Sequence, residues 1–307
     1  MVAQSPRVDP TFHPKPLPFW ARVSRQIRYR LLPSWFPLGH IIKRPEPVSG
    51  MNYVWLRAGS RCVKGNLRET NEDRCYTDAN HGLFLVVDGM GGHHGGGEAS
   101  RILLQTVSEQ LEQVLDASSV DLPTMQRAVQ SALTTARLRM ISFAEQNPDC
   151  QLMGATMALA AVVDNMMYVA HAGDCRVYLV RENRIRRLTT DQTYVHVLVT
   201  AGVISPAEAR THPLRNRVMN LVGVRPMEAP LEVQAIPLET GDRVLLTTDG
   251  LTDVLDDEEI KRIVLSHGHP QSVTDQLVRA ALQNESHDDI GCIAVKFVEA
   301  AIDKLAT

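Results

Sequence analysis

Predicted strands and helices come in blocks along this chain, and that order restricts the folds open to it. A continuous apolar strand at Leu83–Val87 is followed by two helices with apolar residues at helical spacing, Glu98–Asp116 and Thr124–Glu145. The strands expected next are Ala155–Val163, Met166–Ala170, Arg176–Val180 and Arg184–Leu188, the last two joined as a hairpin through Arg181–Asn183. The later elements expected are strands Leu231–Ile236 and Arg243–Thr247, helix Gln271–Gln283 and strand Ile290–Phe297. Without regular strand–helix alternation, the pattern favours an α+β sandwich over a doubly wound sheet.

Composition excludes several classes of protein. The 307 residues are 44% hydrophobic, which is enough to form a full core. A net charge of −3 and 5% aromatic residues give no support to nucleic-acid binding. No apolar run is long enough to span a bilayer, so we expect no transmembrane helix. The 5 cysteines form no C-x-x-C pair, which is typical of a reduced, cytoplasmic protein and argues against a zinc site.

Residues 1–50 differ from the rest by their prolines and positive charge. This segment has a net charge of +6, which leaves −9 for residues 51–307. Between the prolines, Trp20, Val23, Ile27 and Leu31 recur at helical spacing among arginines, as in a short basic amphipathic helix. Such a helix could contact an anionic membrane or an acidic partner, or it could pack on this protein's own domain; a disordered tail is the other alternative. We therefore divide the chain into an N-terminal extension (1–50), a folded domain (51–300) and a C-terminal tail (301–307).

Three aspartates stand at the ends of predicted strands. Asp88 and Asp249 follow apolar strands and precede glycine, and Asp288 comes just before the strand that begins at Ile290. Carboxylates that converge from separate strands repel one another unless a cation lies among them. Oxygen ligands suit Mg²⁺ or Mn²⁺, and two such ions can activate water for phosphoryl transfer. An Asp-Gly pair alone is a common turn, and spacing does not show convergence.

The glycine-rich segment Gly89–Gly97 matches no common phosphate-binding loop. No Gly-Lys-Ser/Thr follows it, and His94 stands where G-x-G-x-x-G requires the third glycine. His93 and His94 could bind metal or transfer protons, or they could be solvated turn residues.

Motifs spread from about Val54 to Phe297 resemble, in order, the protein phosphatase 2C-type (metal-dependent, PPM) family, particularly its bacterial branch. The segments that carry the resemblance include Gly65–Asp73, Val87–Gly92, Gly154–Thr156, Gly173–Arg176, Thr189–Gln192, Ala201–Pro213, Leu221–Gly223, Thr248–Asp253 and His287–Ile290. The resemblance implies a four-layer αββα sandwich, with two central, mostly antiparallel sheets flanked by helices. It also implies a metal site with two Mn²⁺ or Mg²⁺ ions, with room for a third.

The same resemblance implies a role for each site residue. Asp88 bridges both metals, and Gly89 offers its carbonyl to one of them. Asp249 and Asp288 are metal ligands, Glu72 acts through metal-bound water, and Asp73 supports the site. Arg68 binds the phosphate through its planar fork of donors, the alternative being a surface salt bridge. Asp174 binds a third, weaker metal or packs in a turn. The residues expected to be catalytic are Arg68, Asp88 and Asp249.

The expected function is metal-dependent hydrolysis of phosphoserine and phosphothreonine in proteins by a metal-activated water. The partners are phosphorylated proteins, including a cognate kinase or its substrates, and we expect a monomer. The segment Gln192–Gly223 is expected to form a flap beside the site. Met90, Asp289, Ala155 and Gln192 depart from residues usual in the family. Because Asp289 adds a charge beside the site, a pseudophosphatase that binds phosphoproteins without cleaving them stays an alternative. A scaffold acting through residues 1–50 is another.

Overall fold

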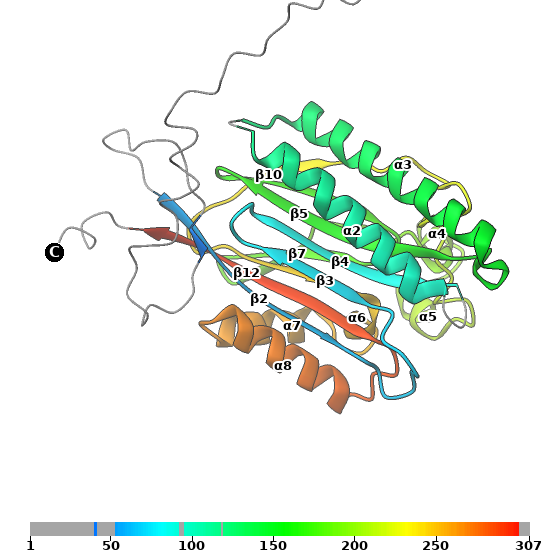
Figure 1. The fold of residues 1–307 in the computed structure, drawn as a ribbon. Helices are drawn as coiled ribbons and strands as arrows, with labels where there is room; N and C mark the ends of the chain where they lie inside the picture. The colour runs from blue at the N-terminus through cyan, green and yellow to red at the C-terminus, as the bar shows by residue number, and fades with distance from the viewer. Residues whose placement is uncertain (1–39, 42–52, 92–94, 118, 301–307) are drawn as a thin grey trace, which may run out of the picture. The chain divides into compact units, whose positions relative to one another are not determined.

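The structure, a computed structural model, describes residues 40–41, 53–91, 95–117 and 119–300 (Figure 1). The predicted helix of the N-terminal extension, the C-terminal tail, His93 and His94 therefore lie outside the described residues. All five cysteines are free, as the sequence predicted. Among the described helices, none is long and apolar enough to cross a membrane.

Two β-sheets form the centre of the fold, and the pairings between their described strands are antiparallel. In order across the first sheet lie β1 (His40–Ile41), β2 (Tyr53–Val63), β12 (Ile290–Ala300), β11 (Arg243–Thr247), β7 (Arg176–Arg181) and β8 (Arg184–Arg187). The second sheet has the order β10 (Gln234–Pro237), β6 (Met166–Ala172), β5 (Gly154–Val163), β4 (Leu83–Met90) and β3 (Arg74–Asp78), and β9 (Val222–Gly223) pairs with β5.

Helices cover the outer face of each sheet, which gives four layers (Figure 1). Helices α2 (Gly95–Leu115) and α3 (Leu122–Gln146) lie over the second sheet, and α7 (Asp257–Ser266) and α8 (Pro270–Gln283) over the first. The short helices are α4 (Tyr194–Thr200), α5 (Pro206–Thr211), α6 (Asp249–Thr252) and the 3₁₀ turn Pro148–Cys150. This arrangement confirms the predicted αββα sandwich.

The first part of β4, Leu83–Val87, shows why this run is apolar without a break. Side chains alternate between the two faces of a strand, so neighbouring residues enter different layers. Leu83 and Leu85 pack into the core beneath α2 and α3, whereas Phe84 and Val86 pack into the core between the sheets. Because both faces are covered, every position must be apolar.

Two predicted strand boundaries were wrong, and the first of them concerns the site. Strand β4 continues through Met90, so Asp88 and Gly89 are ladder residues and not a turn after the strand. The strand expected from Leu231 begins only at Gln234, because the Gln126 side chain binds the backbone at the preceding positions. It donates to the Leu231 carbonyl (2.8 Å) and accepts from the Val233 amide (2.8 Å).

The hairpin between β7 and β8 is present as predicted. Its two turn residues, Glu182 and Asn183, have φ angles of 47° and 63°. Positive φ at both central positions matches the right-handed twist of the flanking strands.

Candidate metal centre

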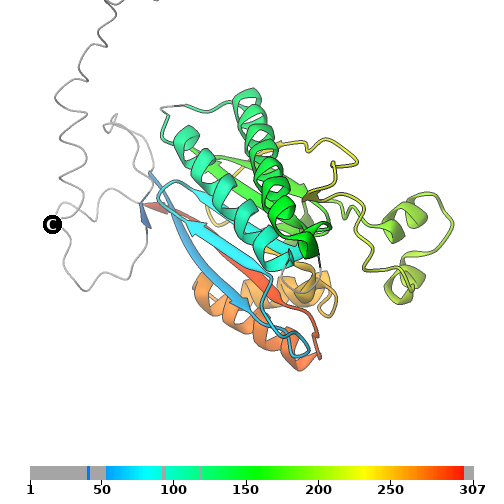
Figure 2. The same cartoon turned by 45° about the vertical axis from the view of Figure 1, so that its right-hand side comes forward.

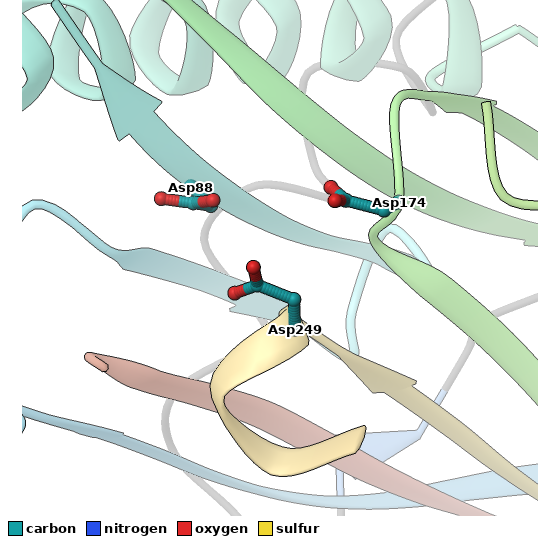
Figure 3. Close-up of side chains that lie close together, drawn as sticks. All are labelled: Asp88, Asp174 and Asp249. Carbon is teal, nitrogen blue, oxygen red and sulfur yellow. The ribbon is translucent and has the colours of Figure 1, made fainter. Parts of the chain in front are cut away.

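Three carboxylates from distant parts of the chain converge at one end of the sheets. Asp88 comes from β4, Asp174 from the turn between β6 and β7, and Asp249 from the first position of α6. Each offers an oxygen, and these oxygens all lie within 4.8 Å of one another. The three side chains point toward a common space in Figure 3.

Close backbone packing brings these segments together. Asp88 is paired in register with Thr156 of β5, so the ladder fixes its direction. A Cβ on Gly250 would lie 1.9 Å from the Asp289 carbonyl oxygen, so only glycine lets the start of α6 approach the strand entry at Asp288. The glycine after Asp249 is therefore required for packing and not for a turn.

Burial and neighbouring negative charges raise the pKa of all three carboxyl groups. Burial is the largest cause for each. The pKa of Asp88 lies well above its usual range, with the charge of Asp249 as the next cause, and that of Asp249 is raised in the same way by Asp174. Burial and the charge of Asp191 raise the pKa of Asp174 to about 6.

This donor set fits a divalent cation. Asp174 is only 7% exposed, and its Oδ1 is a buried oxygen with no hydrogen-bond partner in the described part of the chain. Buried carboxylates without donors are costly unless a positive charge compensates them. Oxygen donors of this kind are the ligands that Mg²⁺ and Mn²⁺ prefer.

Asp288 stands apart from the tight cluster and binds Arg68. An Arg68 guanidinium nitrogen and an Asp288 carboxylate oxygen are 2.6 Å apart, and the Asp289 amide donates to Asp288 Oδ1 (2.8 Å). The hydrogen bond from Arg68 to Asp288 is the largest cause of the raised pKa of Arg68. Arg68, Asp88, Asp249 and Asp288 line the same cleft of ≈ 420 Å³. The Arg68 side chain is 45% exposed, so it stands where a ligand entering the cleft would meet it.

Glu72 and Asp73 support the cluster from the loop between β2 and β3. Glu72 lines the cleft, and its Oε1 accepts from the Gly97 amide at the start of α2 (3.2 Å). Burial raises its pKa. Asp73 is 3% exposed and is not one of the three clustered carboxylates. Its Oδ2 accepts from the Thr248 hydroxyl (2.7 Å), and burial raises its pKa well above the usual range.

Comparison with known proteins agrees with this site. A family model described as protein phosphatase 2C matches residues 59–289. The chain belongs to the protein phosphatase 2C family. Among curated relatives, the serine/threonine phosphatase stp of Listeria welshimeri is 28% identical over 246 residues, which cover 78% of this chain and 96% of that protein.

Solved structures of the family share the fold. The serine/threonine phosphatase PstP/Ppp of Mycobacterium tuberculosis superposes with a TM-score of 0.71 at 29% identity, covering 78% of this chain and 98% of that one. The catalytic domain of a serine/threonine phosphatase PstP in complex with two manganese ions gives a TM-score of 0.70 at 28% identity, covering 80% and 99%. The resemblance seen in the motifs, including its bacterial branch, is confirmed.

Two of the departures from the usual phosphatase 2C residues have clear structural roles. Asp289 is 3% exposed and does not line the cleft. Its Oδ1 accepts from the Gly65 amide (2.9 Å) and its Oδ2 from the Glu72 amide (2.7 Å). Its charge therefore holds the β2–β3 loop in place. Gln192 binds Gly173 next to Asp174 (2.9 Å). Met90 lines the cleft, and Ala155 is a buried strand residue.

Several residues of this phosphatase 2C site had no role in the sequence-based prediction. Thr248 precedes Asp249 in a quoted motif, and besides donating to Asp73 it accepts from the Gly291 amide (2.8 Å). Position in the motif was the signal that could have drawn attention to it. Asn216 and Val218 line the cleft. The resemblance indicated a flap over Gln192–Gly223 beside the site, but no pattern singled out these two residues within it.

Proposed function

We propose that this chain is a metal-dependent protein serine/threonine phosphatase that hydrolyses phosphoserine and phosphothreonine by a metal-activated water. The observation that carries the proposal is the convergence of Asp88, Asp174 and Asp249 in one cluster, with Arg68 on the cleft that Asp88 and Asp249 line. Membership of the protein phosphatase 2C family and the names of its relatives support it.

The site residues divide into cation ligands and a phosphate-binding group. Asp88, Asp249, Asp288 and the Gly89 carbonyl would hold two divalent cations, with Asp174 as ligand of a third. Bound cations would supply Lewis acidity that activates water and neutralises charge on the phosphoryl oxygens. Arg68 would bind the phosphoryl oxygens through its guanidinium fork.

Three side chains around the cluster have further roles. Glu72 would orient water through Oε2, while its Oε1 accepts from the Gly97 amide at the start of α2. Asp73 would support the site through Thr248, whose hydroxyl it binds. Asp288 would keep Arg68 oriented toward the cleft until phosphate competes for the guanidinium.

The finer parts of the proposal follow from the donors and from the family. The bound ions are Mn²⁺ or Mg²⁺, and Asp174 makes room for a third. The substrates are phosphorylated proteins, including a cognate kinase or its targets. The enzyme acts in the cytoplasm as a monomer. The proposed division is an N-terminal extension of residues 1–50, a phosphatase domain of residues 51–300 and a tail of residues 301–307. The extension would contact a membrane or an acidic partner, pack on the phosphatase domain, or be a disordered tail.

The pseudophosphatase alternative loses its main support. It depended on Asp289 as an additional charge in the site, and this carboxylate instead binds two backbone amides outside the cleft. The relatives named as serine/threonine phosphatases also favour an active enzyme.

The test is release of phosphate from a phosphothreonine peptide in Mn²⁺, Mg²⁺ or EDTA, comparing the wild type with Asp249→Asn. We expect turnover that requires the metal and collapses in the variant. Asp256→Asn is a matched control, because Asp256 only caps α7 and asparagine caps a helix equally well. Absence of turnover in the folded, metal-loaded wild type would favour a phosphoprotein-binding protein instead.

A further inference from the structure

The two ends of the flap meet at its base. Within the predicted flap segment Gln192–Gly223, residues 193–218 carry α4 and α5 and extend from the sandwich in yellow-green in Figure 2; these residues are called the flap below. Thr193 and Val218 form a β-bridge, and the Tyr194 amide donates to the Arg217 carbonyl (2.8 Å). One residue closer to the sandwich, the Met219 amide donates to the Gln192 carbonyl (2.8 Å).

Gln192 binds the base of the flap to the turn that bears Asp174. Its Oε1 accepts from the Gly173 amide (2.9 Å) and from Asn220 Nδ2 (3.0 Å). The backbone amide of Gln192 donates to the Gly173 carbonyl (2.9 Å). Asn220 is 2% exposed, and its Oδ1 accepts from the amides of Glu228 and Ala229. Gln192 therefore binds both the amide and the carbonyl of Gly173, and its side chain connects them to Asn220, which is itself held by two backbone amides.

The position of the Asp174 carboxylate depends on this turn. Gly173 has a φ of 88°, and a Cβ on it would lie 2.4 Å from Cγ2 of Thr156, the residue paired with Asp88. Asp174 Oδ1 has no hydrogen-bond partner among the described residues. Since no donor holds that oxygen, the backbone of the turn must set its place, and Gln192 is the residue that binds this backbone.

We propose that Gln192 is a positioning residue that fixes Asp174 for cation binding and couples the bound cation to the flap. The inference rests on the proposed metal-dependent function, because it takes Asp174 as a cation ligand. Partners that orient metal ligands typically change metal affinity by about 10- to 100-fold when they are removed. Coupling is reciprocal, so a cation that favours one arrangement of the turn must also favour one arrangement of the flap.

The first experiment titrates the metal-free protein with Mn²⁺ by calorimetry, with no substrate present. Asp174→Asn should weaken one binding component, and Gln192→Leu should weaken the same component by about tenfold. Gln192→Glu should restore it, because a carboxylate keeps the accepting oxygen. Gln126→Leu is the matched control, since Gln126 also binds a loop backbone through both ends of its amide, but on α3. It should leave Mn²⁺ binding unchanged.

The second experiment follows amide hydrogen exchange in peptides of the flap with and without Mn²⁺. Mn²⁺ should slow exchange in residues 193–218 of the wild type and have little effect in Gln192→Leu. A purely structural role for Gln192 would not produce this metal-dependent difference.

The outcomes separate the inference from the function on which it rests. If the wild type binds no Mn²⁺, the proposed function fails. If the wild type binds Mn²⁺ and Asp174→Asn weakens it, but Gln192→Leu binds like the wild type, only the positioning role is overturned. An Asp174→Asn variant with unchanged binding, or a Gln192→Glu variant as weak as Gln192→Leu, also overturns it.

Discussion

In the metal-free protein, the ionised Asp174 carboxylate should destabilise the fold, and Asp174→Asn should remove that effect. Its pKa is about 6 in the folded protein, against an ordinary value of 3.8. A raised folded-state pKa means that the folded protein binds this proton more tightly than the unfolded chain. The stabilisation from the proton is complete below pH 3.8 and is lost as the pH rises through about 6.

The size of the effect follows from that difference in pKa. A shift of about two pH units corresponds to about 3 kcal/mol of free energy of unfolding, of which about 1 kcal/mol is lost between pH 5 and pH 8. Asparagine cannot ionise, so the variant should lack this part of the pH dependence. Removing the charge also relieves Asp88 and Asp249, whose pKa values Asp174 helps to raise, and this acts in the same direction.

The assay is urea unfolding in EDTA at pH 5 and pH 8, for the wild type and for Asp174→Asn. The free energy of unfolding of the wild type should fall by about 1 kcal/mol more than that of the variant between these pH values. Any cost of the buried amide is independent of pH and cancels in this comparison. Mn²⁺ at pH 8 should stabilise the wild type more than the variant. Equal pH dependence in both proteins would refute the reasoning.

Three other substitutions test separate parts of the site. Arg68→Lys should raise KM by about tenfold or more and change kcat less, because lysine lacks the guanidinium fork. In steady-state kinetics with a phosphopeptide, a variant with KM and kcat both close to the wild type would show that Arg68 only forms a salt bridge. Asp289→Ala should lower the free energy of unfolding by about 3 kcal/mol, since two amides lose their acceptor, and Asp289→Asn by less; equal urea midpoints would contradict this role. Gly250→Ala should lower the melting temperature because its Cβ would meet a carbonyl, whereas Gly97→Ala, with no atom within 4 Å, should not; similar melting temperatures would exclude the packing requirement.

The layered fold could be predicted because burial leaves a periodic signal. Helices α2 and α3 each bury one face, and β4 buries both, so their patterns are long and regular. The flap helices α4 and α5 lack this signal, because α4 buries one residue and α5 none. Caps from Thr193 and Ser205 support them instead. Such short, exposed helices have too few apolar positions to form a pattern.

The candidate site was predictable only in part. Strand ends drew attention to Asp88 and Asp249, and both belong to the cluster. The third strand-end residue, Asp288, binds Arg68, while the third clustered carboxylate is Asp174. Asp174 does not directly follow the predicted strand Met166–Ala170, and only the family motif indicated a metal there. Which carboxylates meet depends on backbone contacts between segments far apart in the chain, and spacing does not encode those contacts.

The charges around the cluster connect metal binding to stability. In the part of the chain that the structure describes, no lysine or arginine hydrogen-bonds to Asp88, Asp174 or Asp249, and the nearby Arg176 is committed to Asp191 (2.6 Å). A permanent internal cation would stabilise the metal-free fold, but it would also compete with the metal for the same oxygens. The three clustered carboxylates therefore lack a compensating cation until a divalent metal ion binds. Part of the free energy of metal binding is used to overcome the repulsion among them. It follows that a substitution that neutralises one clustered carboxylate should stabilise the metal-free protein while it weakens metal binding.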